Sequence, residues 1–259
     1  MKIHFYKYQG TGNDFVMIDN RNEMFPKNDV SLINQLCDRR FGVGADGLIL
    51  LENADDADFN MVYFNADGTE STMCGNGGRC LVAFANQLKI IDAKATFNAV
   101  DGLHHATFND GIVSLQMIDV ITVETYNNHF FLDTGSPHHV EFVNKAELVD
   151  VKNTGAKIRY GAPYFDKGTN VNFVEIINEQ SIKVRTYERG VEDETLSCGT
   201  GVTAAAIVAF NAGIIKENNI DIEALGGKLS VSFDKDNDSF KNVFLTGPAT
   251  FVFEATIEI

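Results

Sequence analysis

The chain has 259 residues, which is enough for one large domain or two smaller ones, each with its own hydrophobic core. Its net charge of −15 excludes non-specific binding to nucleic acid, which requires a basic surface. The longest uncharged apolar run, around residues 202–211, is shorter than the ~20 residues that span a bilayer, and the N-terminus has no apolar signal-peptide core. We therefore expect a cytoplasmic protein that binds neither nucleic acid nor membrane.

Taken in chain order, the hydrophobic patterns predict a chain in which strands outnumber helices. The predicted strands are 2–8, 47–51, 60–64, 181–187, 228–233 and 250–259. The predicted helices are 31–39, 77–88 and 201–212, the last of them followed by Gly213 as a C-terminal cap residue. The second and third helices consist mainly of small and apolar residues, so we expect both to be buried.

An internal repeat divides the sequence into two halves. Residues 63–77 align without a gap to residues 187–201, with Tyr, Glu, Cys, Gly and Gly coinciding, and both copies run on into a predicted buried helix. A second match aligns residues 10–20 with residues 168–178 through the shared pattern G-T-x-x-[DN]-F-V. The order of the two matches is the same in each half, which favours duplication over chance.

The repeat predicts a two-domain α/β fold, more closely α+β, with pseudo-symmetric homologous halves. We expect residues 1–118 to form the first domain, completed by residues 249–259, and residues 119–248 to form the second. Each domain is predicted to be a mostly antiparallel sheet curled around its central helix. The active site is expected in the cleft between the two domains.

Cys74 and Cys198 occupy the same place in the two copies, directly before Gly-x-Gly and a helix. Unpaired amides and the positive end of a helix dipole stabilise a thiolate there, which lowers the pKa of such a cysteine. The glycines let the backbone amides approach a carboxylate closely. Two such sites facing each other suit inversion at a carbon atom: one thiolate removes the α-proton of an amino acid, and the opposite thiol returns a proton. The helix N-termini can then stabilise the charge that develops on the α-carboxylate.

The other two cysteines and three of the histidines have simpler interpretations. Cys37 and Cys80 are expected to be buried structural residues, since most cysteines in a globular protein are. No CxxC or other zinc-ligand spacing occurs, so no metal is expected. His139, His104 and His105 are expected at the surface.

Four segments resemble the diaminopimelate epimerase family, and the resemblance extends over the whole chain. They are Gly10-Thr11-Gly12-Asn13-Asp14-Phe15, the run 40–47, the run 65–79 around Cys74, and the run 187–201 around Cys198. The resemblance implies interconversion of LL- and meso-diaminopimelate in lysine and peptidoglycan precursor biosynthesis. It also implies that the enzyme uses no cofactor, pyridoxal phosphate included, and that it forms a homodimer.

Carried over position by position, the resemblance implies a role for each matching residue. Cys198 would take the proton from the LL substrate and Cys74 would deliver one. The residues implied in substrate binding are Asn13, Asn65, Gly75, Asn76, Asn170, Glu188, Arg189, Gly199 and Thr200. His138, together with Glu188, would tune the pKa of the thiols. Ser136 departs from the family, which usually has Asn there, so the contact to the distal amino acid is in doubt.

Two other kinds of protein remain as alternatives. One is another two-cysteine isomerase of the same fold, such as a proline racemase or hydroxyproline epimerase, although Glu188 and Arg189 suit a second amino-acid head group better. A phenazine-type isomerase, a relative without the two thiols, is argued against by Cys74 and Cys198. The other is a non-catalytic module in which the helix N-termini bind an anion and the thiols are structural.

Overall fold

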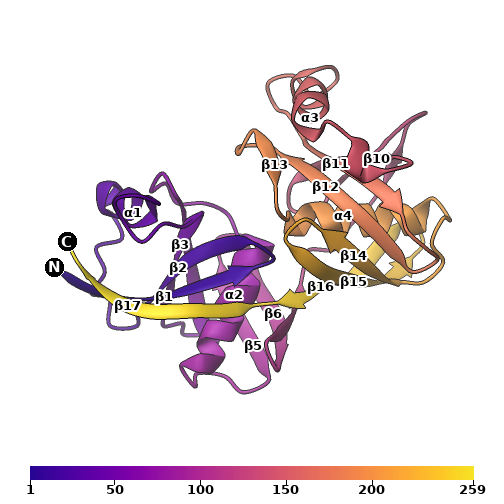
Figure 1. Ribbon diagram of the computed structural model, residues 1–259. Coiled ribbons are helices and arrows are strands. Elements are labelled where there is room, and N and C mark those ends of the chain that lie inside the picture. The colour runs from indigo at the N-terminus through magenta and orange to yellow at the C-terminus, as the bar shows by residue number, and fades with distance from the viewer. The chain divides into compact units, whose positions relative to one another are not determined.

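The structure, a computed structural model, describes residues 1–259 and falls into two compact units (Figure 1). The first unit comprises Met1–Leu115 and Gly247–Ile259, and the second comprises Gln116–Thr246. The two chain ends therefore belong to the same unit, where the yellow C-terminal strand runs beside the indigo N-terminal one. None of the helices has both the length and the apolar character that crossing a membrane requires.

The first unit is an eight-stranded sheet with two helices. Its elements are β1 (Lys2–Gly10), β2 (Asn13–Asp19), α1 (Val30–Cys37), β3 (Gly47–Glu52), β4 (Phe59–Asn65), α2 (Gly75–Gln87), β5 (Lys94–Ala99), β6 (Gly102–Asn109), β7 (Ile112–Gln116) and β17 (Thr250–Glu258). The strands follow the order β17-β1-β2-β3-β4-β5-β6-β7. Pairs β2–β3 and β4–β5 are parallel and the others are antiparallel, so the predicted mostly antiparallel sheet is confirmed.

The second unit is built in the same way. Its elements are β8 (Glu124–Thr125), β9 (Phe130–Asp133), β10 (Pro137–Phe142), the 3₁₀ turn η1 (Ala146–Leu148), α3 (Val151–Tyr160), β11 (Asn170–Ile176), β12 (Ser181–Glu188), β13 (Asp193–Thr195), α4 (Gly199–Asn211), β14 (Asn219–Ala224), β15 (Gly227–Asp236) and β16 (Ser239–Pro248). The main sheet runs β8-β9-β10-β11-β12-β14-β15-β16, with β13 paired to the end of β12. Pairs β10–β11 and β12–β14 are parallel.

The pairing pattern from β1 to β7 is identical to that from β9 to β16, which confirms the two repeated domains. Both series read antiparallel, parallel, antiparallel, parallel, antiparallel, antiparallel. Strand β4 and helix α2 correspond to β12 and α4, so the match of residues 63–77 to 187–201 aligns equivalent elements. Each cysteine therefore follows an equivalent strand and precedes an equivalent helix.

The second sequence echo, between residues 10–20 and 168–178, does not align equivalent elements and is wrong as a sign of duplication. It matches β2 with β11, but β2 is the partner of a preceding antiparallel strand, whereas β11 is the parallel partner of β10. In the common pattern β2 corresponds to β10, and β3 to β11. A glycine-rich turn before a buried strand produces the shared G-T…F-V pattern at two different places in the fold.

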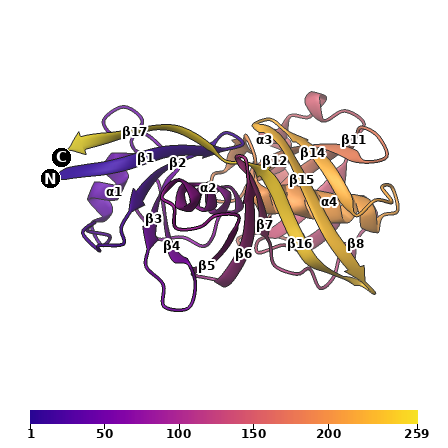
Figure 2. The same ribbon diagram turned by 90° about the horizontal axis from the view of Figure 1, so that it is seen from below.

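Helices α2 and α4 form the cores of their units. Helix α2 packs against β1, β2, β3, β6 and β17, and Figure 2 shows it enclosed by the strands of its own unit. Helix α4 packs against β9, β10, β11, β12, β14 and β15. Nearly every residue of α4 is buried, since Ala, Val and Ile cover all of its faces. The prediction of a sheet curled around a buried helix is confirmed in both halves.

Candidate active-site residues

Cys74 is the N-cap residue of α2, in an extended conformation (φ −109°, ψ 123°). A Ser or Asp at this position would use its own side chain to cap the first-turn amides, but Cys74 makes no side-chain cap hydrogen bond. Its carbonyl begins the helix by accepting from the Gly78 N–H at 2.7 Å. The thiol and the first amides of α2 therefore lie together at the positive end of the helix dipole.

Two of the predicted residues, Asn13 and Asn76, converge around this thiol. The Cys74 Sγ lies 3.6 Å from Asn13 Oδ1, and the Asn76 side-chain amide donates to the same oxygen at 3.2 Å. The Asn13 Nδ2 donates in turn to Asp46 Oδ2 at 2.7 Å. No local sequence pattern selects Asp46, which lies in the loop before β3 and contacts Asn13 because β2 and β3 are parallel neighbours.

Asn65, the fourth predicted polar residue of the first unit, lies at the end of β4. Its backbone N–H donates to Thr69 O at 2.9 Å and its side chain donates to Thr69 Oγ1 at 3.4 Å. These bonds close the tight turn after β4, where Gly68 has φ +86°. The structure thus shows Asn65 in a turn-forming role.

Cys198 is the N-cap residue of α4, with nearly the same backbone conformation as Cys74 (φ −114°, ψ 112°) and again no side-chain cap hydrogen bond. Its Sγ lies 3.4 Å from Thr200 Oγ1, and Thr134 Oγ1 donates to Thr200 O at 3.0 Å. A Cβ added at Gly201 would stand 2.5 Å from Asn172 Oδ1 and 3.3 Å from Cys198 Sγ. The second glycine of the motif is therefore required by close packing beside the thiol.

His138 lies fully buried on β10, and its tautomer follows from its neighbours. Asn172 Nδ2 lies 3.1 Å from His138 Nδ1 and 3.0 Å from the backbone carbonyl of His139. Because a carbonyl only accepts, the amide nitrogen of Asn172 faces both atoms, and His138 Nδ1 must accept. The proton is then on Nε2, which is buried and has no hydrogen-bond partner.

The charge state of His138 is fixed by the same surroundings. Burial, and to a smaller degree the positive charge of Arg189, lowers the pKa of His138 to about 3. His138 is therefore a neutral hydrogen-bond donor at ordinary pH. It cannot be the base that removes a proton from a thiol, because Nε2 already carries hydrogen and Nδ1 is occupied by Asn172.

The remaining predicted residues of the second unit form a chain of contacts at the start of β11. Asn170 Nδ2 donates to Ser136 Oγ at 2.8 Å and to Pro137 O at 3.1 Å, while Asn170 Oδ1 accepts from the Arg189 N–H at 2.8 Å. The Arg189 guanidinium is exposed and donates to Lys167 O at 2.9 Å. Glu188, at the end of β12, is half-buried. Ser136 thus takes part in orienting Asn170.

The other two thiols are inert by position. Burial raises the pKa of Cys37 and that of Cys80 to about 12, so both stay protonated. The expectation that they are buried is confirmed.

The expected surface positions of His139 and His104 are wrong, whereas His105 is exposed. His139 is only 4% exposed, stacks on His129 with ring centroids 4.3 Å apart, and bonds Tyr164 OH through Nδ1 at 2.9 Å. His104 is 6% exposed and contacts Asp101 Oδ1 at 3.0 Å. In both cases an aromatic stack and a polar partner compensate the burial of the imidazole.

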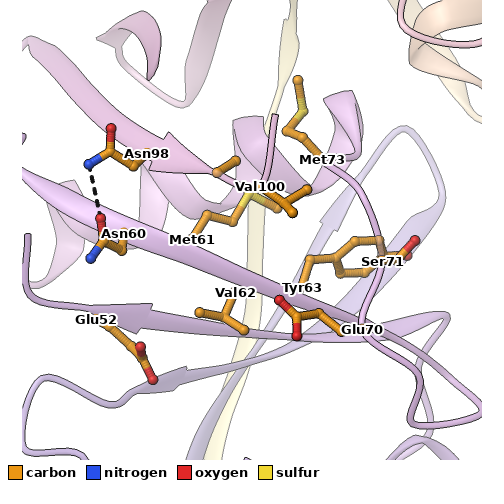
Figure 3. Close-up of a pocket in the computed structure, with 11 residues that line it drawn as sticks. Glu52, Asn60, Met61, Val62, Tyr63, Glu70, Ser71, Met73, Asn98 and Val100 are labelled. Atoms are coloured by element: carbon orange, nitrogen blue, oxygen red, sulfur yellow. Dashed lines mark hydrogen bonds between the residues drawn. The ribbon is translucent and has the colours of Figure 1, made fainter. Parts of the chain in front are cut away.

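A hollow of about 270 Å³ lies on the first unit, beside β4 and the segment that leads to Cys74 (Figure 3). Its lining includes Met61, Tyr63 and Met73, with the carboxylates of Glu52 and Glu70 at its edge. Two carboxylates make this hollow unsuitable for an anion. The polar groups that suit an anion lie instead at the N-termini of α2 and α4.

Comparison with known proteins gives consistent matches over the whole chain. The family described as diaminopimelate epimerase matches residues 5–117 and 130–252. A diaminopimelate epimerase of Flavobacterium psychrophilum is 62% identical over 98% of this chain and 100% of its own length. That of Chlorobaculum tepidum is 42% identical over 96% of this chain and 99% of its own length. Among solved structures, a Bacillus anthracis phenazine biosynthesis protein of the PhzF family has a TM-score of 0.79 at 13% identity, with 100% of both chains covered, which shows the fold.

Proposed function

This chain belongs to the diaminopimelate epimerase family, and we propose that it interconverts LL- and meso-diaminopimelate with the thiols of Cys74 and Cys198 as its acid and base. The observation that carries the proposal is the repeated placement of a cysteine at the N-cap of a buried helix. Both cysteines have extended backbone, neither caps its helix, and each unit supplies one. A structural role for two thiols does not require this repeated geometry.

The reaction needs one thiolate and one thiol at a time. The Cys198 thiolate removes the α-proton of the LL substrate, so the Cα–H bond breaks and its electrons delocalise into the α-carboxylate. The Cys74 thiol then delivers a proton to the opposite face, which leaves Cys74 as the thiolate and Cys198 as the thiol. In the reverse direction the two exchange roles, so the pair titrates as a coupled system.

The developing negative charge requires donors that are already in place. We propose that the backbone amides of Gly75, Asn76, Gly199 and Thr200 hold the reacting α-carboxylate. Amides at a helix N-terminus suit this role because their dipoles need no reorganisation when the charge forms. The remaining polar side chains proposed to bind the substrate are Asn13, Asn65, Asn170, Glu188 and Arg189. Arg189 offers a planar pair of donors for the carboxylate at the distal end.

His138 is proposed to act on the thiols as a neutral donor, with Glu188 as the neighbouring acidic group. The buried Nε2–H of His138 has no hydrogen-bond partner, and burial holds its pKa at about 3. Such a group stabilises a nearby anion by donating a hydrogen bond, without exchanging a proton with it. This assignment makes the thiol pair itself the site of all proton transfer.

We also propose that the enzyme is a cytoplasmic homodimer. Strand β17 pairs with β1 along one edge, and Phe251, Val252 and Phe253 on it remain 42–52% exposed. Exposed apolar groups of this size on an edge strand suit contact with a second copy. The unbridged thiols of Cys37 and Cys80 are compatible with a reducing compartment.

The test is incorporation of solvent deuterium at the α-carbon of LL-diaminopimelate by the purified, reduced protein. We expect incorporation together with formation of the meso isomer, and loss of epimerisation by at least about 10³-fold in both Cys74→Ser and Cys198→Ser. Cys37→Ser is the matched control and should retain activity. Deuterium incorporation into proline instead would indicate the racemase alternative, and binding without any exchange would indicate the non-catalytic one.

A further inference from the structure

Arg79 is a buried cation without an anionic partner. Its side chain is fully buried within α2, and its hydrogen bonds end on three neutral oxygens: Gly75 O at 3.4 Å, Thr11 Oγ1 at 3.2 Å and Asn76 Oδ1 at 3.1 Å. Its Nε has no partner. Burial lowers the pKa of Arg79, but a guanidinium remains charged in proteins. An isolated buried charge is costly, so an anion formed close to Arg79 would be stabilised by it.

Within the first unit, two groups that can become negatively charged act on Arg79, the thiols of Cys80 and Cys74. Cys80 follows Arg79 directly in α2, but burial raises the pKa of Cys80 to about 12, so this thiol remains neutral. Cys74 is half-buried and sits at the helix N-terminus, where a thiolate is stabilised. The anion that Arg79 can balance is therefore the thiolate of Cys74.

A chain of hydrogen bonds connects the two residues. Arg79 Nη2 donates to Asn76 Oδ1, Asn76 Nδ2 donates to Asn13 Oδ1 at 3.2 Å, and Asn13 Oδ1 lies 3.6 Å from Cys74 Sγ. A guanidinium can only donate, and the Asp46 carboxylate at the far end can only accept. Both amides therefore have a single orientation, in which Asn13 turns its oxygen toward Cys74. This oxygen accepts the S–H of the thiol form.

The second unit has the same position without the charge. Thr203 stands five residues after Cys198, as Arg79 stands five residues after Cys74. Thr203 Oγ1 donates to Gly199 O at 2.9 Å, which repeats the bond from Arg79 Nη1 to Gly75 O. The two side chains bond the helix in the same way, but at this position the first unit has a buried cation and the second has a neutral hydroxyl.

We propose that Arg79 is the buried counter-charge of Cys74, a positioning residue that stabilises the thiolate formed when Cys74 gives up its proton. In that step the S–H bond breaks, the proton goes to the substrate carbon, and the negative charge left on sulfur is balanced by the guanidinium. Asn13 Oδ1 serves the opposite state by accepting from the thiol. Cys74 is thereby supported in both protonation states that the proposed two-thiol function requires, on which this inference rests.

The test measures Cys74 alone, in protein that carries Cys198→Ser. The alkylation rate by iodoacetamide, a neutral reagent, is followed against pH in three forms: Arg79 retained, Arg79→Lys and Arg79→Met. We expect Arg79→Met to raise the apparent pKa of Cys74 by about one unit or more, and Arg79→Lys to shift it by less than about half a unit. An unchanged apparent pKa in folded Arg79→Met protein would overturn the proposal.

Two further variants keep the result interpretable. Met in place of a buried ion often preserves stability; if Arg79→Met does not fold, Arg79→Gln removes the charge and keeps a donor for Asn76. Thr203→Val in a Cys74→Ser background removes the equivalent neutral bond. This variant should change the apparent pKa of Cys198 by less than about 0.3 units. A change as large as the one in Arg79→Met would show that the alkylation profile reports altered packing and not the loss of charge.

The outcome is independent of the epimerase assay. Wild-type protein that fails to epimerise diaminopimelate would end the proposed function and leave the alkylation profile of Cys74 readable. If the protein epimerises diaminopimelate normally and the apparent pKa of Cys74 is the same with and without Arg79, only this inference is overturned.

Discussion

Cys74 and Cys198 hold equivalent places in the two units, but their surroundings differ in charge. Near Cys74, the chain of hydrogen bonds through Asn13 and Asn76 ends at the carboxylate of Asp46 on one side and the buried guanidinium of Arg79 on the other. Near Cys198, the Thr200 hydroxyl that contacts the thiol is neutral, and so is the buried imidazole of His138 in the same unit. Duplication has therefore kept the backbone device, a thiol at a helix N-terminus, while the side chains that control its protonation have diverged.

The two units also orient their amide side chains by different means. In the first unit, a chain of hydrogen bonds runs from the Asp46 carboxylate to the Arg79 guanidinium. These two charged ends fix the orientation of the Asn13 and Asn76 amides between them. In the second, the backbone carbonyl of His139 fixes Asn172, which then fixes the tautomer of His138. Orientation by charge responds to neighbouring protonation states, whereas orientation by a backbone carbonyl does not. We expect the second unit to be the more rigid in its hydrogen bonding. It should nevertheless be the more sensitive to acid, because it contains the buried histidines His138 and His139.

The largest expected effect is a difference in acid stability between the units. In the second unit, burial lowers the pKa of both His138 and His139 to about 3. The unfolded chain binds these protons near pH 6.5, so each histidine contributes stability above that pH that is lost as the pH falls toward 3. The loss is up to about 1.4 kcal/mol per pH unit for each residue.

The first unit should lose less stability than the second when the pH is lowered over the same range. Burial opposes ionisation of Asp14, but hydrogen bonds from Arg39 and Lys7 outweigh it and hold the pKa of Asp14 far below its usual value. Its contribution is present above about pH 4 and is lost only below that. Hydrogen exchange at pH 7, 5.5 and 4.5 should show protection in β11 falling at least about tenfold more than in β2. Equal losses in both strands would contradict the comparison, and His139→Gln should reduce the loss in β11.

A second prediction compares the equivalent glycines Gly77 and Gly201. An alanine Cβ at Gly201 would meet Asn172 Oδ1 at 2.5 Å, an atom held in a buried network, whereas at Gly77 the nearest atom is the mobile end of Ile49 at 2.9 Å. We expect Gly201→Ala to lower the free energy of unfolding by about 2–3 kcal/mol, and Gly77→Ala by about 1 kcal/mol. Urea unfolding of the two variants measures the difference. A larger cost at Gly77 would show that the first unit is the tighter one.

Much of the fold and the central pair of residues could be predicted from the sequence, because both depend on local pattern. The buried helices follow from their apolar composition, and the cysteines from a motif that occurs twice. Helix α3 was missed because its sequence, with Asn153, Thr154 and Gly155 in the middle, has weak helix propensity and its structure buries only Val151 and Gly155.

The partners of the cysteines could not be predicted in the same way. Asp46 and Asn172 reach their positions through strand pairing between distant segments, and no local pattern indicates the pairing. Arg79 lies two residues beyond the repeat of residues 63–77, opposite Thr203 of the second unit, so the comparison that found the cysteines passed over it. The match of residues 10–20 to residues 168–178 was misleading for a related reason. A glycine turn followed by a buried strand has a similar sequence wherever it occurs in a fold, so the match does not identify equivalent strands.

The smallest expected effect concerns the neutral partner of Asn170. Ser136→Ala removes one acceptor from Asn170 Nδ2, but Pro137 O at 3.1 Å and the Arg189 N–H on Oδ1 still hold the amide. We expect KM for diaminopimelate to rise about two- to fivefold and kcat to stay within about twofold, the result of losing roughly one weak hydrogen bond. Asp46→Ala, which removes the charged acceptor of Asn13, should raise KM more. A fall in kcat for Ser136→Ala would show instead that Asn170 acts in the proton transfer. It would also show that the neutral partner of Asn170 matters as much for activity as the charged partner of Asn13.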